Sequence, residues 1–392
     1  MMRIAILNIT SGGMSGGYRR YLDAILLRFA AHPEVTELLV GLPTGIGDSL
    51  RGASPPTVRW VTIRTSHTFV TTPETLGIAE ALRAFRPDVI FVPTARPFVC
   101  ASAPIVTMLR NMEPLAFPNH ENPLAERVRT WLRRRAAQEA VRRADHVVAI
   151  SQFVREFLMT RWGVPESRVS VAYHGVCPTS ATPVRPLTLP AGWNDDFCFT
   201  AGSIRPARGL DDVLGALQSL PASVRVAIAG DVAPTMRGYA ASRRTWAERA
   251  GLRDRVAWLG PLSDAEMAWC YAHCRVFVMT SRVEACPNTA LEAMAAGCII
   301  VAAENPPLPE MFGNVASYYH PRNCRDFIER MRVVLAWSRL DRECASARAR
   351  ERGSQFTWEH CIDRTLLAFQ RVATLAVKPH IQQSLSSIGI RS

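Results

Sequence analysis

Residues 281–302 read SRVEACPNTALEAMAAGCIIVA and carry two carboxylates, Glu284 and Glu292, eight positions apart. The Pro-Asn pair that ends at Asn288 predicts a helix start, because proline suits the first turn and asparagine can accept the free amide hydrogens there. Gly297 predicts the end of that helix, and the apolar residues after it predict a buried strand. One acid is therefore expected in a loop and the other one turn inside a helix.

The start of this helix lies between the two acids. Backbone amides near Asn288 and Thr289 would donate hydrogen bonds to an anion, and the helix dipole favours negative charge at this end. Glu284 and Glu292 would accept hydrogen bonds from hydroxyl groups on either side of that anion. A sugar nucleotide presents its groups in this order: sugar hydroxyls, phosphate, ribose hydroxyls. We therefore expect this segment to bind such a ligand.

The same segment resembles the E-x7-E motif of retaining glycosyltransferases of the GT-B fold, in particular glycosyltransferase family 4. The family pattern is close to S-x-x-E-x-x-P-x-x-x-L-E-A-M-A-x-G, and this chain matches it at Ser281, Glu284, Pro287, Leu291, Glu292, Ala293, Met294, Ala295 and Gly297. The resemblance implies two Rossmann-like α/β domains that face each other across a cleft, with the reaction in that cleft. It also implies a C-terminal helix that crosses back to the first domain.

Apolar runs alternate with helical stretches along the chain, which is typical of parallel α/β units. We expect strands at 4–9, 88–92, 105–109 and 146–150, and in the second half at 197–201, 225–230, 256–259, 276–279 and 299–302. Proline-rich sequence at 178–190 predicts a linker. The expected parts are an acceptor-side domain at 1–180, a nucleotide-sugar domain at 181–355, a crossover helix at 356–375 and a mobile tail at 376–392.

A glycine-rich loop at 11–17, SGGMSGG, follows the first expected strand. It does not fit the G-x-G-x-x-G fingerprint of dinucleotide-binding oxidoreductases, and no suitable acid follows about 20 residues later. Glycines let the backbone approach an oxyanion at a helix start. In the family the equivalent loop borders the donor phosphate, so the resemblance makes Gly16 and Gly17 donor-binding candidates. A tight strand-to-helix turn is the alternative interpretation.

Residues 202–217, GSIRPARGLDDVLGAL, resemble the family pattern G-R-L-x-x-x-K-G-x-x-x-L-x-x-A, in which two basic side chains bind the donor diphosphate. Arg208 occupies the lysine position, and its guanidinium can bind phosphate through two hydrogen bonds. Ser203 stands where the family usually has arginine, and Arg205 follows two residues later. The resemblance makes Arg208 the stronger phosphate ligand and Arg205 the weaker one.

Further likenesses extend the match. The stretch 255–281 resembles the family region in which L-G-x-L-S lines the base pocket, which implies that Gly260 and Leu262 lie near the nucleobase. After the strand at 105–109 many members carry a histidine near the reaction centre, whereas this chain has Arg110. We expect Arg110 and Glu284 to be the catalytic residues, and whether Arg110 replaces the histidine in function is left open.

Composition agrees with a two-domain protein, because 392 residues with 48% hydrophobic content can bury two cores. No run of eighteen apolar residues and no signal peptide is evident, so a cytoplasmic location is expected. Ten cysteines without a C-x-x-C pair make a zinc site improbable, and no metal or cofactor is expected.

The net charge of +12 comes almost entirely from arginine, since Lys378 is the one lysine. Arginine is densest at 126–145, where a basic amphipathic helix is expected. Two interpretations stay open for this helix: contact with an anionic membrane surface, or an ordinary solvated face. No nucleic-acid motif is present, so we expect no nucleic-acid partner.

These patterns together predict a retaining glycosyltransferase. Its donor would be a GDP-, UDP- or ADP-linked sugar, and its acceptor a hydroxyl of a glycan or glycolipid in bacterial cell-surface polysaccharide, lipopolysaccharide or glycolipid synthesis. A GT-B sugar-nucleotide epimerase and a non-catalytic nucleotide-binding scaffold are the alternatives. The sequence does not specify the sugar, the base, the linkage or the oligomeric state.

Overall fold

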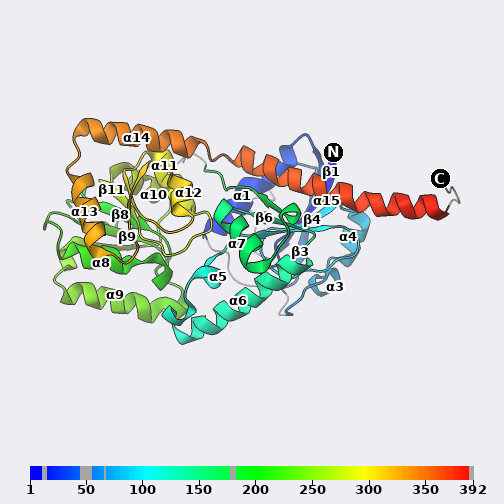
Figure 1. Cartoon of the computed structure of the whole chain (residues 1–392), viewed down its shortest axis with the longest axis horizontal. Helices are drawn as coiled ribbons and strands as arrows, with labels where there is room; N and C mark the ends of the chain where they lie inside the picture. Colours follow the sequence, from blue (N-terminus) through cyan, green and yellow to red (C-terminus); the bar gives the residue numbers. More distant parts are fainter. Residues whose placement is uncertain (11–15, 45–54, 66–67, 177–181, 388–392) are drawn as a thin grey trace. The chain divides into compact units, whose positions relative to one another are not determined.

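The computed structural model describes residues 1–10, 16–44, 55–65, 68–176 and 182–387. The chain divides into two compact units (Figure 1). Unit 1 comprises Met1–Arg110, Leu132–His174 and Trp358–Ser392, and unit 2 comprises Asn111–Trp131 and Gly175–Thr357. The expected loop residues 11–15 and the part of the expected linker at 178–181 lie outside the described residues.

Unit 1 is built on a seven-stranded parallel sheet with the order β3-β2-β1-β4-β5-β6-β7. The central strands are short runs of β-branched and other apolar residues that are buried on both faces, as a parallel sheet requires. The strands are β1 (Met2–Leu7), β2 (Val35–Pro43), β3 (Val58–Ile63), β4 (Val89–Val92), β5 (Ile105–Leu109), β6 (His146–Ala149) and β7 (Val169–Val171).

Three of these strands were not expected from the sequence. β2 carries polar residues, Thr36 and Glu37, after its first residue, and β3 is an edge strand with exposed and half-exposed positions, of which Arg59 is exposed. β7 has three residues and also lies at an edge. The continuous apolar run that marks a central parallel strand is weak in β3 and β7, whereas β2 has a buried run at 38–43 that the sequence analysis did not identify as a strand.

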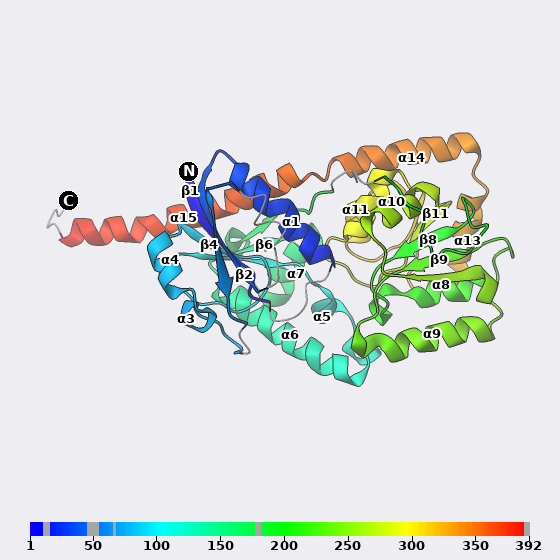
Figure 2. The same cartoon turned by 180° about the vertical axis from the view of Figure 1, so that it is seen from behind.

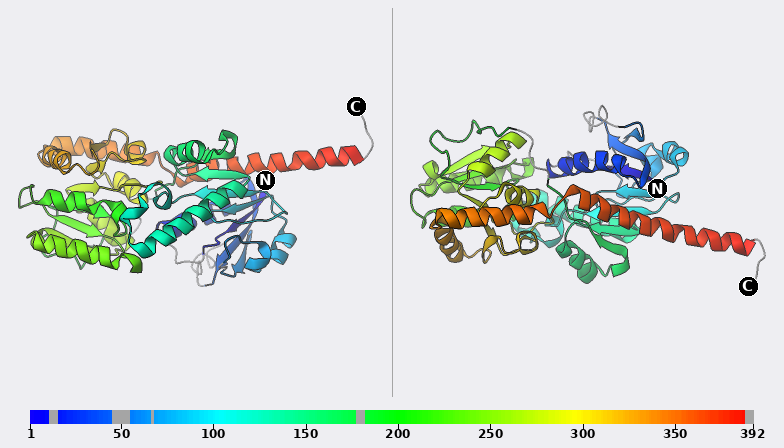
Figure 3. Two further views of the ribbon diagram at one scale, coloured as in Figure 1. Left: turned by 60° about the horizontal axis from the view of Figure 1, so that its bottom comes forward. Right: turned by 90° about the horizontal axis from the view of Figure 1, so that it is seen from above.

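The helices of unit 1 are α1 (Gly16–Ala31), α3 (Pro73–Leu76), α4 (Ala79–Phe85), α7 (Gln152–Trp162) and α15 (Trp358–Ser387). α15 packs against α1, β4, β6 and β7, and Figure 3 shows it in red beside the strands. The buried ring of Phe369 in α15 lies 5.9 Å from that of Phe29 and 5.1 Å from that of Phe91. The helix continues to Ser387, beyond the end at 375 that the sequence suggests.

Unit 2 contains a six-stranded parallel sheet with the order β10-β9-β8-β11-β12-β13. The five expected strands are present, and β13 is an additional half-exposed edge strand with polar character. The bounds are β8 (Cys198–Ala201), β9 (Val226–Ala229), β10 (Val256–Gly260), β11 (Val276–Met279), β12 (Ile300–Ala303) and β13 (Ala316–Tyr319).

Helices cover both faces of the unit 2 sheet, with α8 and α9 on one side and α10, α11 and α14 on the other (Figure 2). The helices are α5 (Glu113–Ala116), α8 (Leu210–Leu217), α9 (Arg237–Arg249), α10 (Asp264–His273), α11 (Asn288–Ala296), α12 (Leu308–Phe312), α13 (Cys324–Leu335) and α14 (Arg339–Ser354). The basic helix predicted at 126–145 is α6 (Leu124–Arg143), which begins in unit 2 and ends in unit 1.

Candidate functional site

The loops after β8 and β11 form the core of the candidate site. These strands are neighbours in the sheet, so the loops at their carboxyl ends lie side by side. Gly209 has a φ of 62°, and a Cβ atom there would lie 2.2 Å from the carbonyl oxygen of Thr280. The Thr280 hydroxyl in turn donates to the carbonyl oxygen of Arg208 at 2.7 Å. This close backbone contact fixes Arg208 against the segment that carries the two acids.

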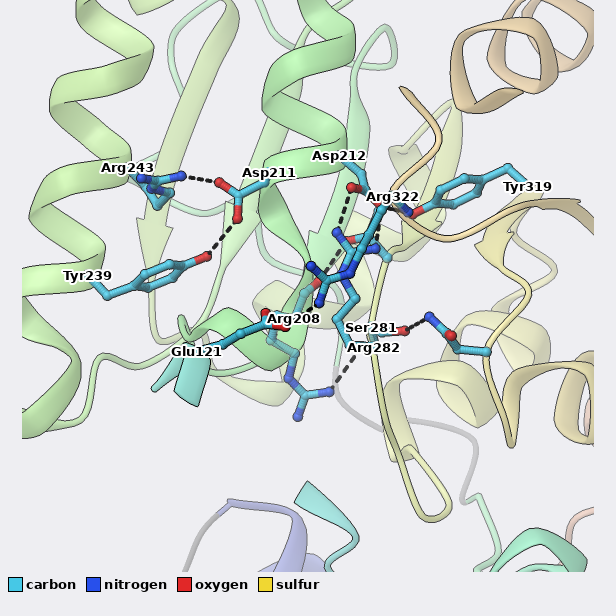
Figure 4. Close-up of polar contacts among 12 residues, drawn as sticks. Glu121, Arg208, Asp211, Asp212, Tyr239, Arg243, Ser281, Arg282, Tyr319 and Arg322 are labelled. Carbon is cyan, nitrogen blue, oxygen red and sulfur yellow. Dashed lines mark hydrogen bonds and ion pairs between the residues drawn. The ribbon is translucent and has the colours of Figure 1, made fainter. Parts of the chain in front are cut away.

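Arg208 points toward the loop after β11. Its Nη1 donates to the Ser281 hydroxyl at 3.3 Å, and its guanidinium forms an ion pair with Glu284 (Figure 4 shows Arg208 and Ser281). Burial lowers the pKa of Arg208 to about 10, against the opposing effect of the Glu113 carboxylate, so the side chain remains charged at neutral pH. The phosphate-binding candidate and the loop acid are therefore in direct contact.

Arg205 is held by a different acid. Its Nη1 lies 2.6 Å from an oxygen of Glu113, and both side chains are mostly buried, with exposures of 19% and 15%. Glu113 belongs to the segment Asn111–Trp131, which is part of unit 2 although it lies far from Arg205 in the sequence. Arg205 and Arg208 thus each have a carboxylate partner within this unit.

A buried network supports the loops from behind. Asp212 accepts two hydrogen bonds from Arg282, at 2.7 and 2.6 Å, and one from the Tyr319 hydroxyl at 2.7 Å. The backbone amide of Arg322 also donates to Asp212, at 3.3 Å (Figure 4). Because Asp212 and Arg282 flank Arg208 and Ser281 in the two loops, this network ties the start of α8 to the loop after β11.

Glu292 lies in the second turn of α11, where the hydroxyl of Tyr271 donates to it at 2.9 Å. The expectation that Asn288 caps this helix with its side chain is wrong. Pro287 is the N-cap residue and no side chain caps it, while Asn288 is the first helical residue and Thr289 the second. Both residues therefore stand in the first turn of α11, and their expected role toward an anion stays a prediction.

Gly260 ends β10, and its carbonyl oxygen accepts a hydrogen bond from Gly230 at 2.8 Å. Gly230 has a φ of 154°, and a Cβ atom there would lie 1.8 Å from the carbonyl oxygen of Gly202. The backbones after β8, β9 and β10 therefore meet without intervening side chains. Leu262 follows Gly260 and is half-buried just before α10.

Arg110, Gly16 and Gly17 belong to unit 1. Arg110 follows β5, and its guanidinium lies 4.0 Å from the ring centre of Tyr18. Its buried Nη1 has no hydrogen-bond partner among the described residues, and burial lowers the pKa of Arg110. Gly16 and Gly17 are the first two residues of α1 rather than loop residues as expected, so the helix begins two positions early.

Two family models match this chain in succession. The model described as Glycosyltransferase Family 4 matches residues 16–179, and the one described as Glycosyl transferases group 1 matches residues 191–352. The chain belongs to the group 1 glycosyltransferases. Its two parallel-sheet α/β units are the two Rossmann-like units of the GT-B fold.

Named relatives within the group 1 glycosyltransferases are distant. The O-antigen chain mannosyltransferase B of Escherichia coli is 25% identical over 254 residues, covering 60% of this chain and 63% of the relative. A D-inositol 3-phosphate glycosyltransferase of Mycolicibacterium smegmatis is 28% identical over 250 residues, covering 61% of this chain and 56% of the relative. This chain therefore spans 56–63% of the length of these two relatives.

Solved structures share the fold of this group 1 glycosyltransferase. The Anabaena protein HepE in complex with UDP and glucose has a TM-score of 0.70 at 20% identity, covering 94% of this chain and all of HepE. Sucrose-phosphate synthase from Thermosynechococcus elongatus has a TM-score of 0.67 at 18% identity, covering 96% of this chain and all of that one. At these identities the likeness establishes the fold alone.

The structure brings most of the expected donor-side residues of this group 1 glycosyltransferase into unit 2. The sequence analysis did not single out five supporting residues: Glu113, Asp212, Tyr271, Arg282 and Tyr319. Asp212 lies in the quoted G-L-D-D stretch, so its position was visible but its partners were not. Across the described part of the chain, no group of His, Cys, Asp and Glu side chains is arranged to hold a metal ion, and no helix could span a membrane.

Proposed function

We propose that this group 1 glycosyltransferase transfers a sugar from a nucleotide-diphosphate donor to a hydroxyl acceptor with retention of configuration. The observation that carries the proposal is the position of Arg208, a charged guanidinium in contact with Ser281 and Glu284 in the loop that leads into α11. This places a cation, a helix amino terminus and a carboxylate within one pair of loops. A diphosphate that carries a sugar has groups for all three.

Departure of the nucleoside diphosphate leaves negative charge on the phosphate, while the sugar gains oxocarbenium character. Fixed donors directed at the phosphate lower this barrier, because they bind the transition state more strongly than the ground state. In this proposal Arg208 and the first-turn amides of α11, at Asn288 and Thr289, stabilise the leaving diphosphate. Arg205 supports them from its position beside Glu113. These groups supply the positive charge from the protein, so the proposal needs no metal ion.

The two motif acids have different neighbours and are assigned different roles. Glu284 lies in the loop beside Arg208, where its charge can orient the sugar hydroxyls and favour the developing positive charge on the sugar. Glu292 lies inside α11 and is fixed by Tyr271, which suits a static contact with the ribose hydroxyls. Gly260 and Leu262 are assigned to the nucleobase.

Arg110 is assigned a catalytic role, and Gly16 and Gly17 at the start of α1 are assigned to the donor phosphate. A buried cation without a carboxylate partner is unfavourable unless another anionic or strongly polar group accepts its hydrogen bonds. Arg110 lacks such a partner among the described residues and rests on the face of Tyr18, which leaves donors of its guanidinium available to a substrate.

The proposed setting is cell-surface polysaccharide, lipopolysaccharide or glycolipid synthesis at the inner face of the cytoplasmic membrane. One curated relative is named an O-antigen chain mannosyltransferase, which supports this choice of pathway class. On α6, four apolar side chains are exposed by 48–75% and alternate with arginines: Leu124, Val128, Trp131 and Leu132. Exposed apolar and basic side chains on one helix suit a surface of anionic lipid.

The test is transfer by the purified chain from GDP-, UDP- and ADP-linked sugars to a panel of glycan and glycolipid acceptors. Proton NMR of the product should show the same anomeric configuration as the donor. Incubation with donor alone should give no isomerised sugar nucleotide. A product with inverted configuration would refute the stereochemical part of the proposal. Isomerisation of the donor without an acceptor would show that the protein is an epimerase rather than a transferase.

A further inference from the structure

A cavity of about 290 Å³ opens at the edge of the unit 2 sheet opposite to Arg208. Asp196, Arg225 and Arg275 line it, and each lies one or two residues before a strand: β8, β9 and β11. These three strands are adjacent in the sheet, so the side chains that precede them gather at one place. The amide of Cys198 donates to the carbonyl oxygen of Arg225, and the amide of Arg275 donates to that of Phe197, both at 2.8 Å. These hydrogen bonds hold the backbone around the cavity in place.

The cavity carries more positive than negative charge. Arg332, from the end of α13, is a third arginine in its lining, and Asp196 is the one acid in that lining. Arg342 of α14 lies close enough to interact with Arg275 and Asp196, and its pKa is lowered by burial and by the neighbouring Arg275. Within the lining, a single carboxylate therefore stands against three guanidinium groups.

Several N–H groups of these arginines have no hydrogen-bond partner within the described part of the chain. Arg275 bonds to Asp196 at 3.0 Å and to the carbonyl oxygen of Leu335 at 2.6 Å, yet its buried Nε has no partner. Nε and Nη2 of Arg342 are also buried without a partner. The side chain of Arg225 makes no hydrogen bond to a described residue, and its guanidinium lies 5.6 Å from the centre of the Trp193 ring. Among the arginines that line the cavity, Arg225 therefore has its side-chain donors uncommitted, and an added anion could accept hydrogen bonds from them.

We propose that this cavity binds a small organic phosphate at a site separate from the donor site. Guanidinium groups match the oxygens of a phosphate in number and geometry, and Phe197 and Leu335 provide apolar wall for a short carbon skeleton. The volume is at the lower end for a small-molecule site, so it suits a phosphomonoester rather than a nucleotide. The site stands independently of the glycosyl-transfer proposal.

The probe is glycerol 3-phosphate, with glycerol and inorganic phosphate as comparisons, in calorimetric titrations of the Arg208→Ala protein. That background removes the phosphate ligand at the opposite edge. We expect one molecule of glycerol 3-phosphate to bind, glycerol not to bind, and inorganic phosphate to bind more weakly. Absence of binding at millimolar concentrations would refute the site. Equal affinity for inorganic phosphate would refute the claim that the site recognises an organic phosphate.

Arg225→Gln in this background should weaken binding at least tenfold, because one charge-assisted contact is lost. Arg244→Gln is the matched control, since Arg244 also lies over a tryptophan, 5.4 Å from the Trp258 ring centre, but outside the cavity. The control should bind as the parent does. Equal affinity of the two variants would overturn the proposal, and thermal unfolding of both confirms that each is folded.

Discussion

Arg208 and Glu284 form an ion pair in the loops at the carboxyl ends of β8 and β11. The cation expected to bind the donor phosphate is thus already paired with the acid expected to contact the sugar. A diphosphate that binds Arg208 competes with Glu284 for the same guanidinium. Displacement of the carboxylate would free it for the sugar, so phosphate binding and placement of the acid are coupled.

Arg208→Ala should weaken binding of the cognate nucleoside diphosphate far more than Arg205→Ala. Loss of a charge-assisted bond to phosphate costs on the order of 1.5–3 kcal/mol. Arg205 is paired with Glu113 at 2.6 Å, whereas Arg208 contacts Ser281 and Glu284 in the loop that leads into α11. Calorimetric titration of both variants measures the difference, and equal, unchanged affinities would remove this segment from the site.

Glu284→Gln should lower turnover by orders of magnitude while the affinity for the donor stays the same or rises slightly, because a competing anion beside Arg208 is removed. Glu292→Gln should mainly raise the donor's KM, because a contact to the ribose is similar in ground and transition states. Tyr271→Phe should resemble a weak form of Glu292→Gln, since it removes the hydroxyl that fixes Glu292. Steady-state kinetics at saturating acceptor distinguish these patterns, and interchangeable effects of the two Glu variants would contradict the assignment.

Asp212→Ala should destabilise unit 2 by about 3–5 kcal/mol, because it leaves the buried Arg282 without its carboxylate. The neighbouring Asp211 provides a control, since its side chain is 47% exposed and pairs with Arg243 on the surface. Asp211→Ala should cost less than about 1 kcal/mol. Urea denaturation of both variants measures the contrast, and similar midpoints would show that the Asp212 network contributes little.

Replacement of Arg133, Arg134 and Arg135 by Gln should release the protein from liposomes that contain anionic lipid, and more strongly at low salt than at high salt. Leu132→Ser should weaken the same binding through loss of an apolar contact, whereas Leu340→Ser is the control, because Leu340 is 69% exposed on a different helix. Cosedimentation is the measurement. Negligible binding of the unchanged protein at low salt would defeat the membrane proposal.

His146 should make the fold sensitive to acid. Burial, aided by Arg371 and Arg168, lowers the pKa of His146 to about 4. Below its ordinary pKa the unfolded chain takes up a proton that the folded chain does not, so the free energy of unfolding falls as the pH drops from about 6.5 toward 4, by up to about 3 kcal/mol. Urea midpoints across this range should fall less steeply for His146→Gln than for the exposed control His360→Gln.

The contact between Arg208 and Glu284 involves residues that the sequence singles out, because these residues and Glu292 lie in two short contiguous segments. Arg208, Glu284 and Glu292 occupy fixed places relative to a glycine, a proline and a helix start, and local sequence carries that information. The parallel sheets were predictable where strands are apolar on both faces, as in β11 and β12, and not where they are short or at an edge, as in β7 and β13.

Contacts between distant segments could not be predicted. Arg205 and Glu113 are 92 positions apart, and Tyr319 and Asp212 are 107 apart. Nothing in the local sequence of Glu113 indicates that its segment joins unit 2, because this depends on the chain path through three dimensions. The cap of α11 is a smaller example: asparagine is a good capping residue, but the preceding proline takes the cap position and shifts Asn288 into the helix.

The packing of α15 on unit 1 has a consequence for synthesis on the ribosome. The core around Phe29 and Phe91 is completed by Phe369, which is translated after the whole of unit 2. Unit 2 can fold as soon as residue 357 has emerged, whereas unit 1 must wait with an open apolar surface until α15 arrives. The half of the enzyme whose synthesis begins first is therefore the half that is completed last.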